Sequence, residues 1–173
     1  MRAVAVMSWP PGPAKIARTI METTSASTAE GHDPLEDKPP ELGPDAVQIL
    51  EGTTFAVSDA AGDMPEGVVS GLFHRDTRHL SQWELSIAGK KPVVLTSAPV
   101  DYYSASFTLT NPELPGLAAE SLSIQRFRLV GNGMRESITV ENNLSQPISF
   151  ELRLSCGADF ADLFEVKDRI AEK

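Results

Sequence analysis

After residue 45 the chain alternates apolar and polar residues with a period of two. The clearest example is PISFELRLSC, residues 147–156, where from Ile148 onward the apolar residues occupy even positions and the polar residues odd ones. Successive side chains of a β-strand point to opposite faces, so this pattern predicts a strand with one buried face. Residues 134–142 (MRESITVEN) repeat the pattern. The same part of the chain needs no helix of ordinary length.

Turn signals divide this region into short runs. The sequences GNG and NNLSQP separate three alternating runs that we expect to form an antiparallel meander, residues 121–130, 134–142 and 147–156. In the first run the apolar parity changes at Phe127, which predicts a bulge or a strand covered on both faces. Gly52 marks the corner of a hairpin over residues 46–59. Further strands are expected over residues 81–87, 93–97 and 101–109.

These runs amount to about eight or nine short strands with the turn spacing of an all-β fold, an antiparallel β-sandwich. The first 44 residues differ, because they hold seven of the 13 prolines and show no sustained periodicity. Such a segment cannot bury enough apolar surface to offset the entropy of ordering it. The sequence therefore predicts a disordered tail over residues 1–44 and a β-sandwich domain over residues 45–173.

Charge and cysteine content exclude several classes of protein. The net charge is −9 over 173 residues, and nucleic-acid binding needs a basic surface instead. The single cysteine leaves no internal disulfide and no Cys-rich zinc site, which fits a reducing compartment. The sequence lacks an apolar run long enough to cross a bilayer, as well as a signal-peptide core. We therefore expect a cytoplasmic protein that binds neither nucleic acid nor membranes.

The run HRDTRH contains the first cluster that could carry chemistry. His74, Asp76 and His79 offer two imidazoles and a carboxylate, a ligand set that suits a metal ion. Alternatively, Asp76 bonds backbone amides, or pairs with Arg75 or Arg78, where a strand meets a turn. We favour the second interpretation. Because the chain also has no nucleotide-binding glycine loop, we expect no metal and no cofactor.

The run DFADLFEV contains the second cluster. Asp159, Asp162 and Glu165 recur every three residues and would share one face of a helical turn. Glycoside hydrolysis requires a pair of carboxylates, one as acid and one as base or nucleophile. The alternative is that these acids cap backbone amides or meet a neighbouring domain. We favour the alternative, because catalytic carboxylates lie in a concave pocket and this segment shows no elements that would build one.

Two other sets of residues could bind a ligand. Tyr102 has the parity opposite to Tyr103 and is the better surface candidate for stacking on a sugar ring. Arg126 and Arg128 share a strand face, and Glu136 lies on the next strand. A cross-strand ion pair is the favoured interpretation of these three residues, with an anion site as the alternative.

Four motifs in order carry a resemblance to a known family. They are GLFHRDTRHLSQWELSIAGKKPVVLTSA, TNPEL, RFRLVGNGMRESITVEN and DFADLFEVKD, within about Val47 to Lys167. Together they resemble the N-terminal domain of bacterial and archaeal amylo-α-1,6-glucosidase (glycogen debranching enzyme) family proteins. The resemblance implies a supersandwich-like β-sandwich that precedes an (α/α)₆ toroid. In that family the toroid carries the catalytic carboxylates.

The family continues for several hundred residues beyond the position of Lys173, so the resemblance implies a chain truncated before the catalytic domain. It also implies a non-catalytic accessory domain for a glycoside hydrolase of α-glucan metabolism, whose partner is the toroid in cis or in trans. No catalytic residue carries over to this chain. The motif positions that do carry over are expected to have structural or interface roles; they are Asp76, Thr77, Arg78, Arg126, Glu136, Asp159, Phe160, Asp162, Phe164 and Glu165.

Two alternative functions remain open at this point. The chain could be a self-standing α-glucan-binding module that contacts glucan through Tyr102. Less favoured is a hydrolase that uses Asp159, Asp162 and Glu165.

Overall fold

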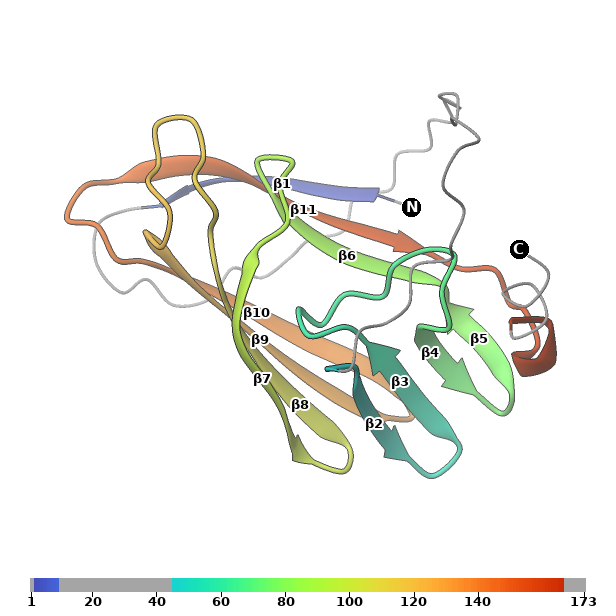
Figure 1. Ribbon diagram of the computed structural model, residues 1–173. Helices are drawn as coiled ribbons and strands as arrows, with labels where there is room; N and C mark the ends of the chain where they lie inside the picture. The colour runs from blue at the N-terminus through green and yellow to red at the C-terminus, as the bar shows by residue number, and fades with distance from the viewer. Residues whose placement is uncertain (1, 10–44, 167–173) are drawn as a thin grey trace.

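The structure is a computed structural model that describes residues 2–9 and 45–166 (Figure 1). Within these residues it is built from strands and a single helical turn at residues 163–166. The strands are β1 (Arg2–Trp9), β2 (Val47–Glu51), β3 (Thr54–Ser58), β4 (Gly71–His74), β5 (Thr77–Leu80), β6 (Gln82–Ile87), β7 (Val93–Asp101), β8 (Ser104–Thr110), β9 (Leu122–Gly131), β10 (Gly133–Asn142) and β11 (Ile148–Gly157).

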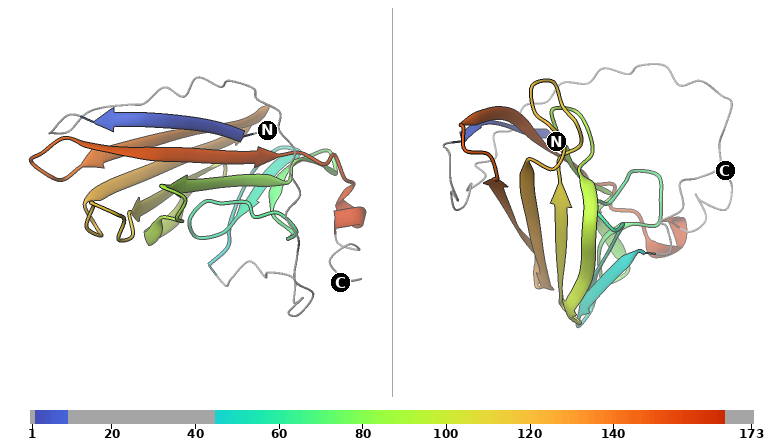
Figure 2. Two further views of the ribbon diagram at one scale, coloured as in Figure 1. Left: turned by 90° about the horizontal axis from the view of Figure 1, so that it is seen from above. Right: turned by 60° about the vertical axis from the view of Figure 1, so that its left-hand side comes forward.

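The strands form three antiparallel sheets, with the orders β1-β11-β6, β10-β9-β8-β7 and β2-β3-β4-β5. Figure 2 shows β1, β11 and β6 running side by side across one layer, with the four-stranded sheet of β7–β10 behind them. The sheet of β2–β5 adjoins the β7–β10 sheet, since β2 contacts β7, β8 and β9. The prediction of an all-β, antiparallel β-sandwich is confirmed.

One hydrophobic core joins all three sheets, because each contributes the apolar residues of its inward parity. Leu85 and Ile87 of β6 are buried, as the alternation in that run predicts. They belong to the same cluster as Phe107 and Leu109 of β8 and Ile49 of β2. Burial of this apolar surface is the main favourable contribution to folding.

The predicted meander is only partly correct. Strands β9 and β10 form the expected hairpin, with Gly131 paired to Gly133. Strand β11, however, pairs with β6 and β1 in another sheet. The loop after β10 carries the chain to the opposite layer, where Phe150 and Leu152 join the core. Alternation fixes which face of a strand is buried but not which strand lies beside it.

The bulge or two-sided burial predicted in β9 is wrong. Its pairing with both β8 and β10 proceeds without a register shift. The inward face continues through Arg126 and Arg128, which are at most 1 % exposed, while Phe127 points outward and is 40 % exposed. The apparent change of parity arose because two buried positions hold arginine instead of an apolar residue.

The predicted disordered tail includes residues 2–9, which in the structure form β1. This strand runs antiparallel to β11, from Arg2 opposite Ser155 to Trp9 opposite Ile148. Because β11 would otherwise present an unpaired edge, it offers backbone hydrogen bonds to a short extended segment whose own composition does not require a strand. Residues 10–44 lie outside the described residues.

Candidate functional site

The Asp76-Thr77-Arg78 motif lies on the hairpin that joins β4 to β5. His74 pairs with Thr77, so Arg75 and Asp76 form a two-residue turn. Both turn residues have positive φ angles, 48° and 66°. Positive φ at both central residues is the requirement of a type I′ turn, whose twist matches that of the flanking strands. The motif therefore begins at the tip of a tight hairpin and continues into edge strand β5.

The DFADLFEV segment lies along this same edge strand. Thr77 and Asp162 form an antiparallel bridge. The amide of Arg78 donates to the carbonyl of Ala161 at 2.9 Å, and the amide of Leu163 donates to the carbonyl of Asp76 at 2.8 Å. Two motifs more than 80 residues apart are thus joined through their backbones. The C-terminal segment also covers an edge that would otherwise be open to pairing with other chains.

Arg78 is the side chain that fastens the two motifs together. Its guanidinium bonds both carboxylate oxygens of Asp159, including Nε to Oδ1 at 3.1 Å. Its Nη1 donates to the carbonyl of Val68 at 3.0 Å and to that of Ser70 at 3.3 Å. The hydrogen bond from Arg78 is the main cause that holds the pKa of Asp159 below its ordinary value. A bidentate pair of this kind fixes direction as well as distance.

Asp162 and Glu165 serve the helical turn. The carboxylate of Asp162 accepts a bond from the amide of Phe164 at 2.8 Å. The carboxylate of Glu165 reaches back to the amide of Asp162 at 3.0 Å. This reciprocal arrangement is a capping box, which satisfies amides that have no partner within the turn. Together with the Arg78 pair, it gives each of the three acids a structural contact, as the alternative interpretation of DFADLFEV predicts.

Two aromatic rings of the same segment face outward. Phe160 is 67 % exposed and Phe164 is 70 % exposed. Phe160 has a φ of 52°, a conformation that a bulky residue adopts only when its surroundings force it. Its ring meets the edge of the His79 ring at 5.8 Å between centroids. In contrast, Ala161 and Val166 of the segment are buried against Phe73 of β4.

The histidines of HRDTRH, which were considered and disfavoured as metal ligands on sequence grounds, have other neighbours in the structure. His74 Nδ1 lies 2.8 Å from the hydroxyl of Thr54. The rings of His74 and His79 meet edge to face at 6.1 Å. Asp76 occupies the turn, so it does not share a strand face with His74. Among residues 2–9 and 45–166, no group of three or more His, Cys, Asp or Glu side chains is arranged to hold a metal ion.

Arg126, Arg128 and Glu136 form the cross-strand ion pair that their spacing predicts. Glu136 lies directly opposite Arg128 in the β9–β10 ladder. Its Oε1 accepts from Arg126 Nε at 3.0 Å, and its Oε2 accepts from Arg128 Nε at 2.7 Å. The indole N–H of Trp83 on β6 also donates to Glu136, at 3.1 Å. The hydrogen bond from Trp83 therefore links this ion pair, which lies within the β7–β10 sheet, to the sheet that contains β6.

The sequence missed a fourth member of this cluster, Asp63. Its Oδ1 lies 2.6 Å from Arg126 Nη1 and accepts from the amide of Leu85 at 3.0 Å. The four side chains of this buried ion cluster, Asp63, Arg126, Arg128 and Glu136, are at most 1 % exposed. Two inward-facing arginines and one glutamate leave a net charge of +1. Such an excess of buried positive charge predicts that a second acidic residue lies nearby, but the sequence does not identify it.

The loop that carries Asp63 also supplies backbone acceptors to the cluster. The carbonyl of Ala61 accepts from Arg126 at 2.8 Å, and the carbonyl of Gly62 accepts from Arg128. Gly62 has a φ of 80°, and a Cβ there would lie 3.0 Å from the Phe107 ring. Only glycine therefore suits both the conformation and the close approach. Arg128 itself lies over that same ring, 5.3 Å from its centroid.

Burial and neighbouring charges act in opposite directions on the cluster. Burial raises the pKa of Asp63, and the attraction of Arg126 does not fully offset it. Burial also tends to raise the pKa of Glu136, but Arg128 and Arg126 outweigh this and hold it below its ordinary value. Of the two carboxylates, Glu136 is therefore the one whose ionised form the arginines of the cluster stabilise more effectively.

Tyr102 is a surface residue, as its parity predicts. It is 63 % exposed, and its ring meets that of Tyr103 at 5.0 Å. Its carbonyl accepts from the amide of Leu50 at 2.7 Å, which ties the β7–β8 turn to edge strand β2. The negative charge of Glu51 is the main cause that raises the pKa of Tyr102. Whether Tyr102 contacts a glucan stays a prediction.

Fold and charged motifs together define an antiparallel β-sandwich module in which arginine–carboxylate pairs join β9, β10 and the Asp63 loop in the core and fasten the C-terminal segment to β5. The chain belongs to the family described as the N-terminal domain of (some) glycogen debranching enzymes, whose model matches residues 49–173. The family suggested by the four ordered motifs is thereby confirmed. No curated protein matches the chain. Among the described residues, no helix has the length and apolar character needed to cross a membrane.

Proposed function

We propose that this chain is a non-catalytic module that packs against an (α/α)₆ glucosidase domain, in cis or in trans, in cytoplasmic α-glucan metabolism. The observation that carries the proposal is the C-terminal motif. Its backbone is bonded to β5, while Phe160 and Phe164 project from it with 67 % and 70 % of their surfaces exposed. Phenylalanine is among the residues enriched in the cores of protein interfaces relative to the rest of the surface.

The geometry also argues for a positioning role over a catalytic one. Asp159 is held by Arg78, and Asp162 and Glu165 cap the helical turn. An acid or a base for glycoside hydrolysis has to reach the substrate, and these carboxylates are committed to backbone and arginine partners. We expect the chain alone to release no glucose from a branched dextrin.

A binding experiment tests the proposal. The partner is the helical glucosidase domain of a debranching enzyme from this family, expressed without its own N-terminal domain. Calorimetry should detect binding of the 173-residue chain, and the double variant Phe160→Ala/Phe164→Ala should weaken it at least tenfold. The matched control is Phe127→Ala, because Phe127 is also exposed but lies on the outer face of β9.

Two results would contradict the proposal. One is the absence of binding to such glucosidase domains at concentrations up to about 100 μM, the weak end of functional protein association. The other is binding that Phe127→Ala weakens as much as the double variant does. Glucose release from a branched dextrin by the chain alone would support the hydrolase alternative instead.

A further inference from the structure

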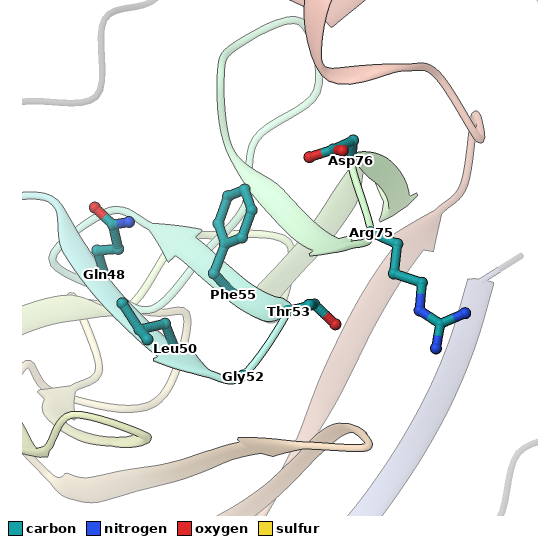
Figure 3. Close-up of a pocket in the computed structure, with 7 residues that line it drawn as sticks. All are labelled: Gln48, Leu50, Gly52, Thr53, Phe55, Arg75 and Asp76. Carbon is teal, nitrogen blue, oxygen red and sulfur yellow. The ribbon is translucent and has the colours of Figure 1, made fainter.

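A hollow of about 430 Å³ opens on the outer face of the β2–β5 sheet. Its lining comes from two hairpin tips, Gln48, Leu50, Gly52, Thr53, Phe55, Arg75 and Asp76 (Figure 3). The C-terminal segment covers the neighbouring part of this face, where Val166 and Ala161 are buried against Phe73. The hollow therefore lies on a part of this sheet face that the C-terminal segment leaves uncovered.

The row of side chains across this face gives the hollow its shape. Leu50 pairs with Phe55, and Phe55 pairs with Phe73, so the three side chains stand side by side on adjacent strands. The Phe55 and Phe73 rings are stacked, with centroids 4.7 Å apart and an interplanar angle of 7°. Phe73 is fully buried and fixes one face of Phe55. The other face of Phe55 looks across Leu50, which is 46 % exposed, into the hollow.

Polar groups lie at the rim on both sides of this aromatic face. Figure 3 shows the amide of Gln48 on one side of the Phe55 ring and the carboxylate of Asp76 above it, while the guanidinium of Arg75 points away from the ring. The backbone fixes this rim. The amide of Arg75 donates to the carbonyl of Thr53 at 3.1 Å, and the carbonyl of Asp76 accepts from Leu163. The two hairpin tips are thus held together before any ligand arrives.

We infer that this hollow binds a neutral pyranose ring, stacked on the free face of Phe55 above Leu50. A sugar ring has an apolar face of C–H groups and an edge of hydroxyls that both donate and accept. The Phe55 and Leu50 surface matches the apolar face, and the Gln48 amide and Asp76 carboxylate match the hydroxyl edge. An apolar wall with a few fixed polar groups is the usual make-up of a small-molecule site.

The rim also selects against other occupants. The Asp76 carboxylate repels phosphate and carboxylate ligands, and the guanidinium of Arg75, which also lines the hollow, is directed away from the ring. An aliphatic side chain of a partner protein would fill the apolar part but leave the Gln48 amide and Asp76 carboxylate without partners. The inference does not depend on the proposed function, because sugar binding by the chain alone requires no glucosidase domain.

An NMR titration of the full chain tests the site, with maltotriose as the probe. We expect saturable amide shifts confined to residues 48–55 and 75–76, with a dissociation constant on the order of 1 mM, as befits a small open site. Glucose 6-phosphate should bind at least fivefold more weakly than glucose because of Asp76.

Variants separate binding from folding. Phe55→Leu keeps an apolar contact with Phe73 but removes the aromatic face, and Asp76→Gly suits the positive φ of the turn. Each should weaken maltotriose binding at least fivefold. Gln48→Ala should weaken it about threefold, a typical effect of losing one exposed hydrogen bond. The matched control is Gln125→Ala, an exposed glutamine on β9, which should leave the affinity unchanged.

Three outcomes would overturn the inference. The first is the absence of a saturable shift with maltotriose up to about 20 mM, a concentration well above the expected dissociation constant. The second is a set of shifts centred on Tyr102 instead of Phe55. The third is an equal loss of affinity in Gln48→Ala and Gln125→Ala. None of these bears on whether the chain binds a glucosidase domain through Phe160 and Phe164, so the two proposals fail separately.

Discussion

Two arginine–carboxylate assemblies in this molecule use the same chemistry in different surroundings. The buried ion cluster lies between sheets, and its four side chains are at most 1 % exposed. The Arg78–Asp159 pair lies nearer the surface, where the Asp159 side chain is 24 % exposed. The low dielectric of the interior strengthens the first assembly and also penalises every unpaired charge in it. The first assembly bonds β9 and β10 to the Asp63 loop and to Trp83 of β6 inside the core, whereas the second fastens the C-terminal segment to β5.

The largest effect is expected from Glu136→Gln. The substitution leaves Arg126 and Arg128 buried with only Asp63 to balance them. Breaking a buried ion pair from one side costs about 3–5 kcal/mol, so we expect the free energy of unfolding to fall by that amount. Urea denaturation followed by Trp fluorescence measures it.

The control for Glu136→Gln is Glu141→Gln, an exposed glutamate on the same strand. Its effect should stay within about 0.5 kcal/mol, as for most surface substitutions. Equal effects of the two variants would mean that the buried ion cluster does not stabilise the folded chain.

A smaller effect is expected from Asp159→Ala. Arg78 keeps its bonds to the carbonyls of Val68 and Ser70 but loses its carboxylate. We expect a loss of about 1–2 kcal/mol, the usual cost of leaving a buried donor without its partner. Hydrogen exchange should accelerate at the amides of Arg78 and Leu163, which bond across the two motifs. Unchanged hydrogen exchange at these two amides would show that the backbone bridge alone holds the segment. The control is Asp45→Asn, a substitution at an exposed aspartate.

The pH dependence of stability tests the contribution of the Arg78–Asp159 pair separately. The pKa of Asp159 is depressed below its ordinary value of 3.8, so the folded state binds its proton more weakly than the unfolded state does. The contribution of the pair is therefore complete above pH 3.8 and is lost as the pH falls through the depressed pKa. The stability difference between the natural chain and Asp159→Asn should be constant from pH 5 to pH 7 and shrink below about pH 3.8. A difference that grew on acidification would contradict this assignment.

The smallest effect is expected from Phe160→Asn. Asparagine tolerates a φ of 52° better than phenylalanine does, and the ring that is lost is 67 % exposed. We expect a gain of about 0.5–1 kcal/mol from relief of backbone strain. Phe164→Asn is the control, because Phe164 is equally exposed but lies in the helical turn, where it should give no gain. A loss of stability in Phe160→Asn would mean that the contact between the Phe160 and His79 rings outweighs the strain.

The strand pattern could be predicted from the sequence because alternation reports burial directly. The strands at residues 147–156 and 134–142 and the hairpin at Gly52 appear where expected. The same pattern misled at Phe127, since an arginine inside a sheet looks like a residue on its surface until its partners are known. The partner of β11 was also mispredicted, because a strand's neighbour depends on contacts that are distant in sequence.

Some contacts of the candidate site could likewise be predicted from the sequence, and others could not. The ion pair of Glu136 with Arg128 could be predicted because the register of the β9–β10 hairpin places these two residues opposite each other. The pairing of Arg78 with Asp159 could not, because 81 residues separate them and no local rule brings them together. Asp63 was missed because its loop carries no periodicity, and the hollow beside Phe55 is made by two hairpin tips that meet only in the folded chain.

By itself the sequence determined the all-β class, the buried face of most strands and the motifs by which the family is recognised. These properties follow from local spacing, since side chains in a strand alternate whatever lies beyond it. Only the tertiary structure decided how three sheets share one core and which carboxylate neutralises each buried arginine. It also decided that Asp159, Asp162 and Glu165 serve as structural contacts. The physical reason is that burial and charge pairing depend on which distant segments exclude water from one another, and alternation along a strand carries no record of them.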